Sequence, residues 1–143
     1  MSHARRWIPA LLLIAGLALS ACAHVSVEEE GIVEPATVEE VDGSDVPRIT
    51  LTADAAERLD IQTSTVADAG PETMVPYAAV FYTADGATWA YANPDPLTYM
   101  RVPIVVDRIN GDRAYLSDGP ASGTDVVTQG LAELYGTETG VEE

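Results

Sequence analysis

The chain has 143 residues, enough for one domain of modest size. It carries 23 acidic and 7 basic residues, for a formal net charge of −16, and all seven basic residues are arginine. This charge argues against a nucleic-acid partner, because affinity for nucleic acid comes mainly from Lys and Arg on phosphates.

Residues 1–21 have the three parts of a secretory signal peptide. Two arginines near the N-terminus give a positive charge, an apolar run of ten residues follows at 10–19, and the small residues Ser20 and Ala21 come next. The run is shorter than the about 20 residues that a membrane-spanning helix needs. The pattern predicts export, with removal of the signal.

The tetrapeptide Leu-Ser-Ala-Cys at 19–22 resembles the lipobox of bacterial lipoproteins. The resemblance implies cleavage between Ala21 and Cys22, a diacylglycerol thioether on Cys22 and acylation of the new amino group. Two or more acyl chains hold a protein stably at a membrane. We therefore expect a lipid anchor in the cytoplasmic membrane, on its extracytoplasmic face; the alternative is a free cysteine in a cleaved or uncleaved signal.

Residues 22–46 are predicted to form a flexible acidic linker. They hold eight carboxylates and no aromatic residue. Such a segment cannot bury enough apolar surface to offset its chain entropy. It would act as a spacer between the lipid and the domain, or it is an acidic leader without a role.

Residues 47–135 are predicted to form a small, mainly β domain, a β-roll or barrel with one short helix. Pattern and turn residues predict its first half, in chain order, as a strand at 48–51, a helix at 53–59 with Thr52 as its N-cap, a strand at 61–66 and a loop at 68–73.

Two hairpins are expected in the second half. Asp85 and Gly86 form a turn between strands at 75–83 and 88–92. Asn110 and Gly111 form a type I′ turn after a long strand, bent or edge-exposed at Pro103. The remaining expected elements are a rigid turn at 93–96, the long strand at 97–109, strands at 114–116 and 126–128, a helical turn or final strand at 131–135, and a disordered acidic tail at 136–143.

Two blocks of this domain resemble parts of the periplasmic adaptor subunits, or membrane fusion proteins, of resistance-nodulation-division efflux pumps. The first block, at 49–63, is similar to their opening, and the second to their membrane-proximal domain. The second block is made of the segments 75–80, 88–91, 105–113, 116–119 and 124–130. Only seven residues, 68–74, separate the blocks, so the lipoyl and coiled-coil hairpin domains of a full adaptor are missing. The resemblance implies a membrane-proximal β domain alone.

Groups suited to catalysis or metal binding are scarce. The histidines His3 and His24 lie in the signal and the linker, so we expect no histidine-based catalysis and no enzyme. Met74 and Met100 are too far apart in sequence for a soft-metal motif. Three oxygen-bearing residues near 110 lack the spacing of a calcium loop. We therefore predict no metal site and no cofactor other than the lipid.

Five aromatic residues could line a ligand groove, although a spacing of two on strands is more typical of a β core. They are Tyr77, Tyr82, Trp89, Tyr91 and Tyr99. The three arginines that follow residue 58 mark a docking patch for an acidic partner or balance local carboxylates. They are Arg101, Arg108 and Arg113.

Together these features predict a lipid-anchored, non-enzymatic module that contacts a membrane transporter, of the efflux class. A second hypothesis is a stand-alone lipoprotein that binds a solute or an envelope component with its aromatic face. A third is a remnant of a full adaptor without a present role.

Overall fold

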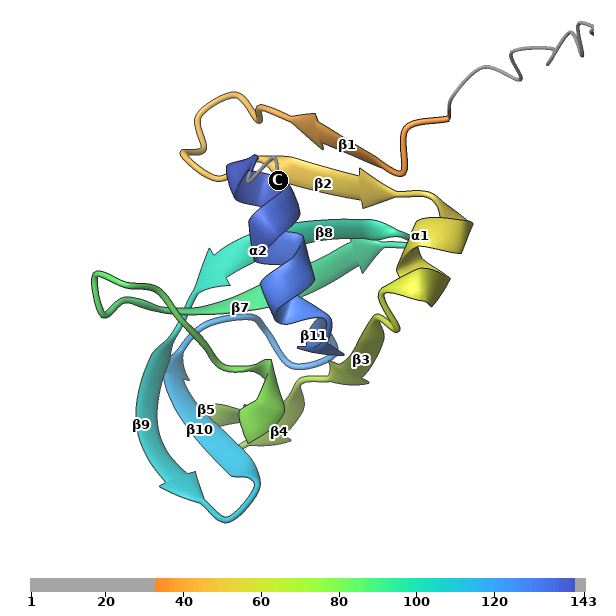
Figure 1. Cartoon of the computed structure of the whole chain (residues 1–143). Helices are drawn as coiled ribbons and strands as arrows, with labels where there is room; N and C mark the ends of the chain where they lie inside the picture. Colours follow the sequence, from red (N-terminus) through yellow and green to blue (C-terminus); the bar gives the residue numbers. More distant parts are fainter. Residues whose placement is uncertain (1–32, 141–143) are drawn as a thin grey trace, which may run out of the picture. The chain divides into compact units, whose positions relative to one another are not determined.

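The structure, a computed structural model, describes residues 33–140. In this range the chain folds into a small, mainly β domain, which confirms the predicted fold class (Figure 1). All strand pairs are antiparallel and form two sheets.

The larger sheet has seven strands. Its order is β1 (Ala36–Glu39), β2 (Arg48–Leu51), β8 (Thr98–Pro103), β7 (Thr88–Asp95), β11 (Asp125–Gln129) and β3 (Gln62–Thr65), and β6 (Phe81–Tyr82) also pairs with β7. The smaller sheet has four strands. Its order is β4 (Ala67–Ala69), β5 (Glu72–Pro76), β10 (Arg113–Asp118) and β9 (Val105–Asn110).

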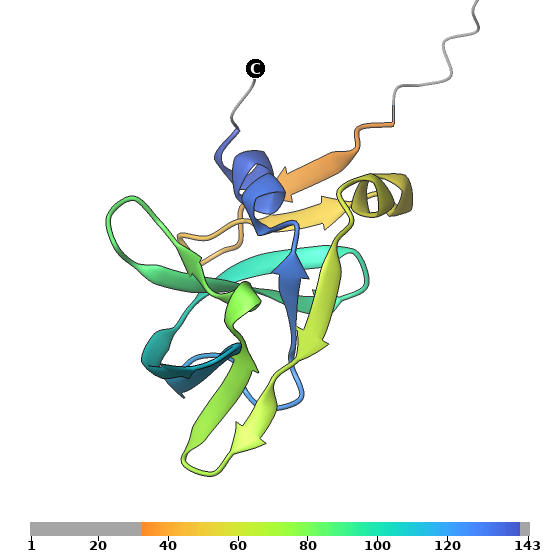
Figure 2. The ribbon, with the colours of Figure 1, turned by 60° about the horizontal axis from the view of Figure 1, so that its bottom comes forward.

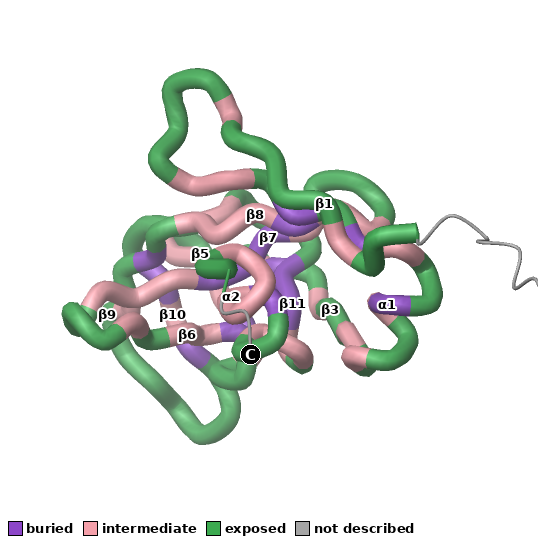
Figure 3. The backbone as a smooth tube through the Cα atoms, turned by 45° about the horizontal axis from the view of Figure 1, so that its top comes forward, coloured by how far each residue is buried: buried purple, intermediate pink, exposed green. Residues whose placement is uncertain are grey.

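Neighbouring residues of a strand point to opposite faces of the sheet. In the central strands β7 and β11 of the larger sheet, residues on both faces are buried. Ala90 and Val126 pack against the smaller sheet, whereas Tyr91 and Val127 pack under helix α2 (Leu131–Thr139). Figure 3 shows the buried positions gathered along β7 and β11. Figure 2 shows α2 and the β4–β5 hairpin at opposite ends of the domain. The larger sheet is therefore the middle of three layers.

The predicted first helix is confirmed as α1 (Ala53–Arg58). The hydroxyl oxygen of Thr52 accepts a hydrogen bond from the backbone N–H of Ala55 at 3.2 Å, as an N-cap residue should. The helix ends in a Schellman motif, in which Asp60 takes a left-handed φ of 49°. The N–H of Ile61 reaches back to the carbonyl of Ala56 at 3.0 Å.

The expected long strand at 97–109 is interrupted at Pro103, where a bend was predicted, but its two halves are separate strands, because the chain changes sheets at Ile104. Pro103 ends β8, since it has no N–H to donate. Ile104 forms two hydrogen bonds with Thr88 of β7. Its N–H donates to the Thr88 carbonyl at 3.1 Å, and the Thr88 hydroxyl donates to the Ile104 carbonyl at 2.7 Å. Thr88 thus joins the two sheets at their crossing.

Two other local predictions are also wrong. The expected loop at 68–73 contains the tight hairpin between β4 and β5, where the Gly70 N–H donates to the Asp68 carboxylate at 3.1 Å. The expected strand at 75–83 is broken by a short 3-10 helix, η1 (Tyr77–Ala79). Backbone pairing with β10 ends at Pro76, which explains the break.

The hairpin between β9 and β10 is confirmed, but its turn is not type I′. Asn110 pairs with Arg113, so Gly111 and Asp112 are the central residues. Of these only Gly111 has a positive φ, of 62°, whereas type I′ requires a positive φ at both. Glycine at the first central position fits type II′ instead.

The flexible linker and the disordered tail are both predicted too long. Residues 36–39 form β1, which pairs with β2 in register. Residues 136–139 complete α2. In both segments the acidic composition hides the order, because β1 is held by backbone pairing and α2 by a few buried contacts.

Candidate functional site

The predicted lipidation residue Cys22 and its neighbour Ala21 lie outside the described residues, as do the signal and the linker up to residue 32. Among residues 33–140, no helix has the length and apolar character needed to cross a membrane. Any site among the described residues lies in the β domain.

The five aromatic residues do not share one face. Tyr91 and Tyr99 are buried in the core between the larger sheet and the helices. Trp89 is half-buried, whereas Tyr77 and Tyr82 are exposed. The core interpretation is thus confirmed for Tyr91 and Tyr99, and a ligand face made of all five residues is excluded.

A buried ion pair ties α2 to the larger sheet. Arg101 Nη2 lies 2.7 Å from Glu138 Oε1, and the Tyr91 hydroxyl donates to Glu138 Oε2 at 2.6 Å. The side chains of Arg101 and Glu138 are only 15% and 4% exposed. Burial, together with the hydrogen bond to Glu138, raises the pKa of Tyr91 well above its ordinary value. The tyrosine therefore stays protonated and keeps donating to the carboxylate.

Aromatic rings surround this ion pair. The Arg101 guanidinium lies 4.3 Å from the centre of the Trp89 ring and 5.5 Å from that of Tyr135. Phe81 packs on Tyr135 with ring centres 4.9 Å apart. Because every one of these contacts is internal, the cluster stabilises the fold, and Arg101 is not part of a docking patch.

The other two arginines also face carboxylates of this chain. Arg108 bonds to Glu72 at 2.5 Å and stacks over the Tyr115 ring at 3.9 Å. Arg113 lies 3.9 Å from Asp112. The sequence left open whether these arginines dock a partner or balance local carboxylates, and the contacts support the second interpretation.

The residues weighed for metal binding are not brought together. Met74 lies on β5 of the smaller sheet and Met100 on β8 of the larger one. The residues Asp107, Asn110 and Asp112 belong to the β9–β10 hairpin and its turn. Among the residues that the structure describes, no group of three or more His, Cys, Asp or Glu side chains is arranged to hold a metal ion.

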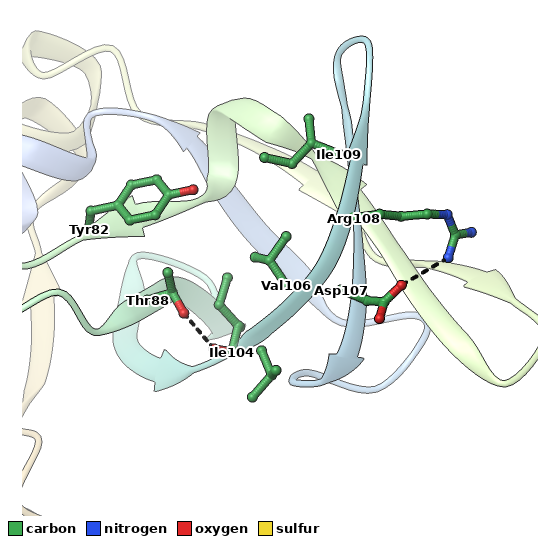
Figure 4. A pocket seen from close by; sticks show the side chains of 8 residues that line it. Tyr82, Thr88, Ile104, Val106, Asp107, Arg108 and Ile109 are labelled. Atoms are coloured by element: carbon green, nitrogen blue, oxygen red, sulfur yellow. Dashed lines mark hydrogen bonds and ion pairs between the residues drawn. The ribbon is translucent and has the colours of Figure 1, made fainter.

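An open groove of about 470 Å³ lies where β6 and β7 approach β9 (Figure 4). The side chains of Val106 and Ile109 point toward Tyr82, whereas those of Asp107 and Arg108 lie on the opposite side of β9. The full lining is made of Tyr82, Thr88 and residues 104–109. The groove is therefore mainly apolar where it faces β6.

Exposed apolar side chains concentrate at this groove. Six large hydrophobic residues in the described part of the chain are exposed: Val33, Val38, Tyr77, Tyr82, Val105 and Ile109. Three of them line the groove. A fourth, Tyr77, lies in η1, which leads into β6. Apolar patches of this kind mark interaction sites more often than scattered apolar residues do.

The groove is also bordered by unpaired strand edges. Within residues 33–140, β9 pairs only with β10, and β6 only with β7. A strand edge offers backbone N–H and C=O groups to another chain. Apolar side chains and free backbone groups thus meet at one place, which we take as the candidate site.

Sequence patterns alone missed both the groove and Glu138. Glu138 follows Leu131 by seven residues and Leu134 by four, so helical spacing places all three on one face. That signal was available within the predicted acidic tail. The groove gave no signal, because it exists only where two sheets cross.

Comparison with known proteins finds no match: no family model, no curated protein and no solved structure is similar to this chain. The resemblance to efflux adaptors stays a prediction.

Proposed function

We propose that the protein is a lipid-anchored interaction module on the extracytoplasmic face of the cell membrane, and that it contacts a membrane transporter of the efflux class. The observation that carries the proposal is the lipobox-like tetrapeptide at 19–22, which follows an apolar run in a chain that continues into a β domain. The module acts by contact and catalyses no reaction.

The residue types of the domain support contact over chemistry. Its sequence contains neither histidine nor cysteine after residue 24, so it lacks the residues for histidine- or cysteine-based catalysis. Three of its five arginines face carboxylates of the same chain. The groove beside β9, in contrast, is open to a partner.

The resemblance to adaptor subunits supports the class of partner. The first similar block contributes β2 and β3, and the second contributes β11. In the larger sheet β3 pairs with β11, so the two blocks belong to one folded unit.

The position of β1 limits how far the domain reaches from the membrane. Residues 23–35 separate Cys22 from β1. A fully extended chain of that length spans at most about 50 Å. The start of β1, at Ala36, therefore lies within that distance of the anchored Cys22.

The test compares the full-length protein with the Cys22→Ser variant in its native membrane. Mass spectrometry of the mature N-terminal peptide should find diacylglycerol on Cys22, and the variant should lose membrane attachment or keep its signal. Affinity purification from detergent-solubilised membranes should recover an efflux-class transporter with the wild type and not with the variant. An unmodified thiol at Cys22, or repeated purification without any transporter, contradicts the proposal.

A further inference from the structure

We propose that the groove between β6 and β9 binds a short extended segment of the partner protein, with alternating apolar and basic side chains, which pairs with the free edge of β9. This inference rests on the proposed function, because it specifies how the module contacts its partner. The backbone of β9 would form hydrogen bonds with the segment, and the groove would hold the apolar side chains of the segment.

The edge of β9 is suited to a short added strand and not to a long one. An extended peptide can join a sheet edge, with backbone hydrogen bonds for affinity and side-chain pockets for specificity. The register of β9 against β10 is irregular between Tyr115 and Leu116 and again between Leu116 and Asp118. Irregularities of this type twist an edge and limit continuous pairing. We therefore expect only a few residues of the partner to pair.

Apolar anchors of the segment would lie in the groove. Val106 and Ile109 of β9 face Tyr82 of β6 across it (Figure 4). Ile109 and Tyr82 are 48% and 51% exposed, so their apolar surface is available. Side chains that alternate along an extended segment place every second residue on this face.

The negative charge of the β9–β10 hairpin determines which side chains the bound segment carries at its other positions. The side chain of Asp107 is 55% exposed on the face of β9 opposite the groove, and that of Asp112 is 97% exposed at the end of the hairpin. Two arginines face three carboxylates here, because Arg108 is shared between Glu72 and Asp107 and Arg113 lies 3.9 Å from Asp112, so one negative charge is left over. Opposite charges stabilise a cross-strand pair and complementary charge favours association. Basic residues at the alternate positions of the segment complement this face.

A second copy of the chain fits the edge poorly. Without residues 1–21 the chain has 23 acidic and five basic residues, a net charge of −18 before the termini are counted, so two copies repel. A symmetric antiparallel pairing centred on the middle of β9 would also place Asp107 or Arg108 opposite its own copy. The occupant is therefore a different, more basic polypeptide.

The test measures peptide binding to the full-length protein in detergent micelles. The probe is a capped heptapeptide in which valine alternates with arginine, and the control replaces each arginine with glutamate. Calorimetry should show at least tenfold tighter binding of the arginine peptide. Amide hydrogen exchange, followed by NMR, should slow at β9 and not at the edge strands β1 and β4. A probe with methylated backbone nitrogens should lose the protection at β9.

Two matched variants locate the contact. Ile109→Ser should weaken binding of the arginine peptide about tenfold, whereas Val38→Ser should leave it unchanged, although Val38 is similarly exposed, at 44%, on β1. An unchanged NMR spectrum outside β9 shows that Ile109→Ser is folded.

This inference is overturned if neither peptide binds or if both bind equally. It is also overturned if hydrogen exchange slows at another strand edge, or if both serine variants lose the same binding affinity. Lipidated Cys22 and a recovered transporter would then still uphold the proposed function. Conversely, specific peptide binding by a chain that is not lipidated would contradict only the proposed function.

Discussion

Two of the arginine–carboxylate pairs among residues 33–140 lie in opposite surroundings. Arg101 of β8 and Glu138 of α2 form an ion pair almost without solvent contact, and Tyr91 of β7 completes the network. Arg108 and Glu72 lie on the smaller sheet, with the Arg108 side chain 50% exposed. The buried pair therefore holds α2 on the larger sheet, whereas the exposed pair contributes little to stability and lies on the surface of the smaller sheet.

The largest expected effect is the loss of the buried carboxylate. Glu138→Ala should lower the free energy of unfolding by about 3–5 kcal/mol, because Arg101 is left buried and unpaired. Glu72→Ala should cost under about 1 kcal/mol, because water screens the exposed pair. Urea denaturation of the two variants measures the difference. Equal losses would show that α2 is not held by its ion pair.

Next in size is a steric test of the start of α2. Gly130 has a φ of +90°, and a Cβ there would lie 2.2 Å from Ile61 Cδ1. Gly130→Ala should lower the free energy of unfolding by about 2–4 kcal/mol, from backbone strain and overpacking.

Gly123 provides a matched control for Gly130. Its φ is +89°, but nothing lies within 4 Å of a Cβ at this position. Gly123→Ala should therefore cost only the strain, about 1–2 kcal/mol. If the two variants lose the same stability by urea denaturation, packing between α2 and Ile61 has no effect.

The third effect depends on alkaline pH. The pKa of Tyr91 is raised by burial, so above pH 10 the unfolded chain loses this proton while the folded chain keeps it. Stability is then fully present below pH 10 and falls above it by about 1.4 kcal/mol per pH unit for this tyrosine. The chain has no lysine to titrate in the same range. Urea denaturation between pH 8 and pH 11 should show a shallower loss for Tyr91→Phe, and an unchanged slope would contradict the buried hydrogen bond.

The smallest expected effect concerns the groove. Ile109→Ser and Val105→Ser should change the free energy of unfolding by less than about 0.5 kcal/mol, because both side chains are half exposed in the free protein. Thermal unfolding of the two variants measures this. A loss of several kcal/mol would mean that these residues serve the core and not a partner.

Local elements were the part of the fold that sequence patterns could predict. The cap at Thr52 and the turn residues Asp85 and Gly86 act within a few positions, so their structures followed from neighbouring residues. The exchange of sheets at Ile104 depends on Thr88, sixteen residues earlier, and no local pattern encodes it.

The buried ion pair and the candidate site were less predictable than the local elements. Glu138 looked like part of an acidic tail, because its role depends on Arg101 and Tyr91 from two other elements. Ile109 looked like one residue of a longer strand, and its exposure follows from the position of β9 at a sheet edge. Both residues acquire their roles only through contacts between distant segments.

The most direct test of the central claim is photo-crosslinking in intact cells with the lipid-anchored chain. A photo-reactive amino acid replaces Ile109 in one strain and Val38 in another. We expect position 109 to crosslink to the external part of a membrane transporter, position 38 to give no such product, and Cys22→Ser to abolish the crosslink. A transporter crosslink from position 38 alone, or one that Cys22→Ser leaves unchanged, would contradict a membrane-tethered module that docks through β9.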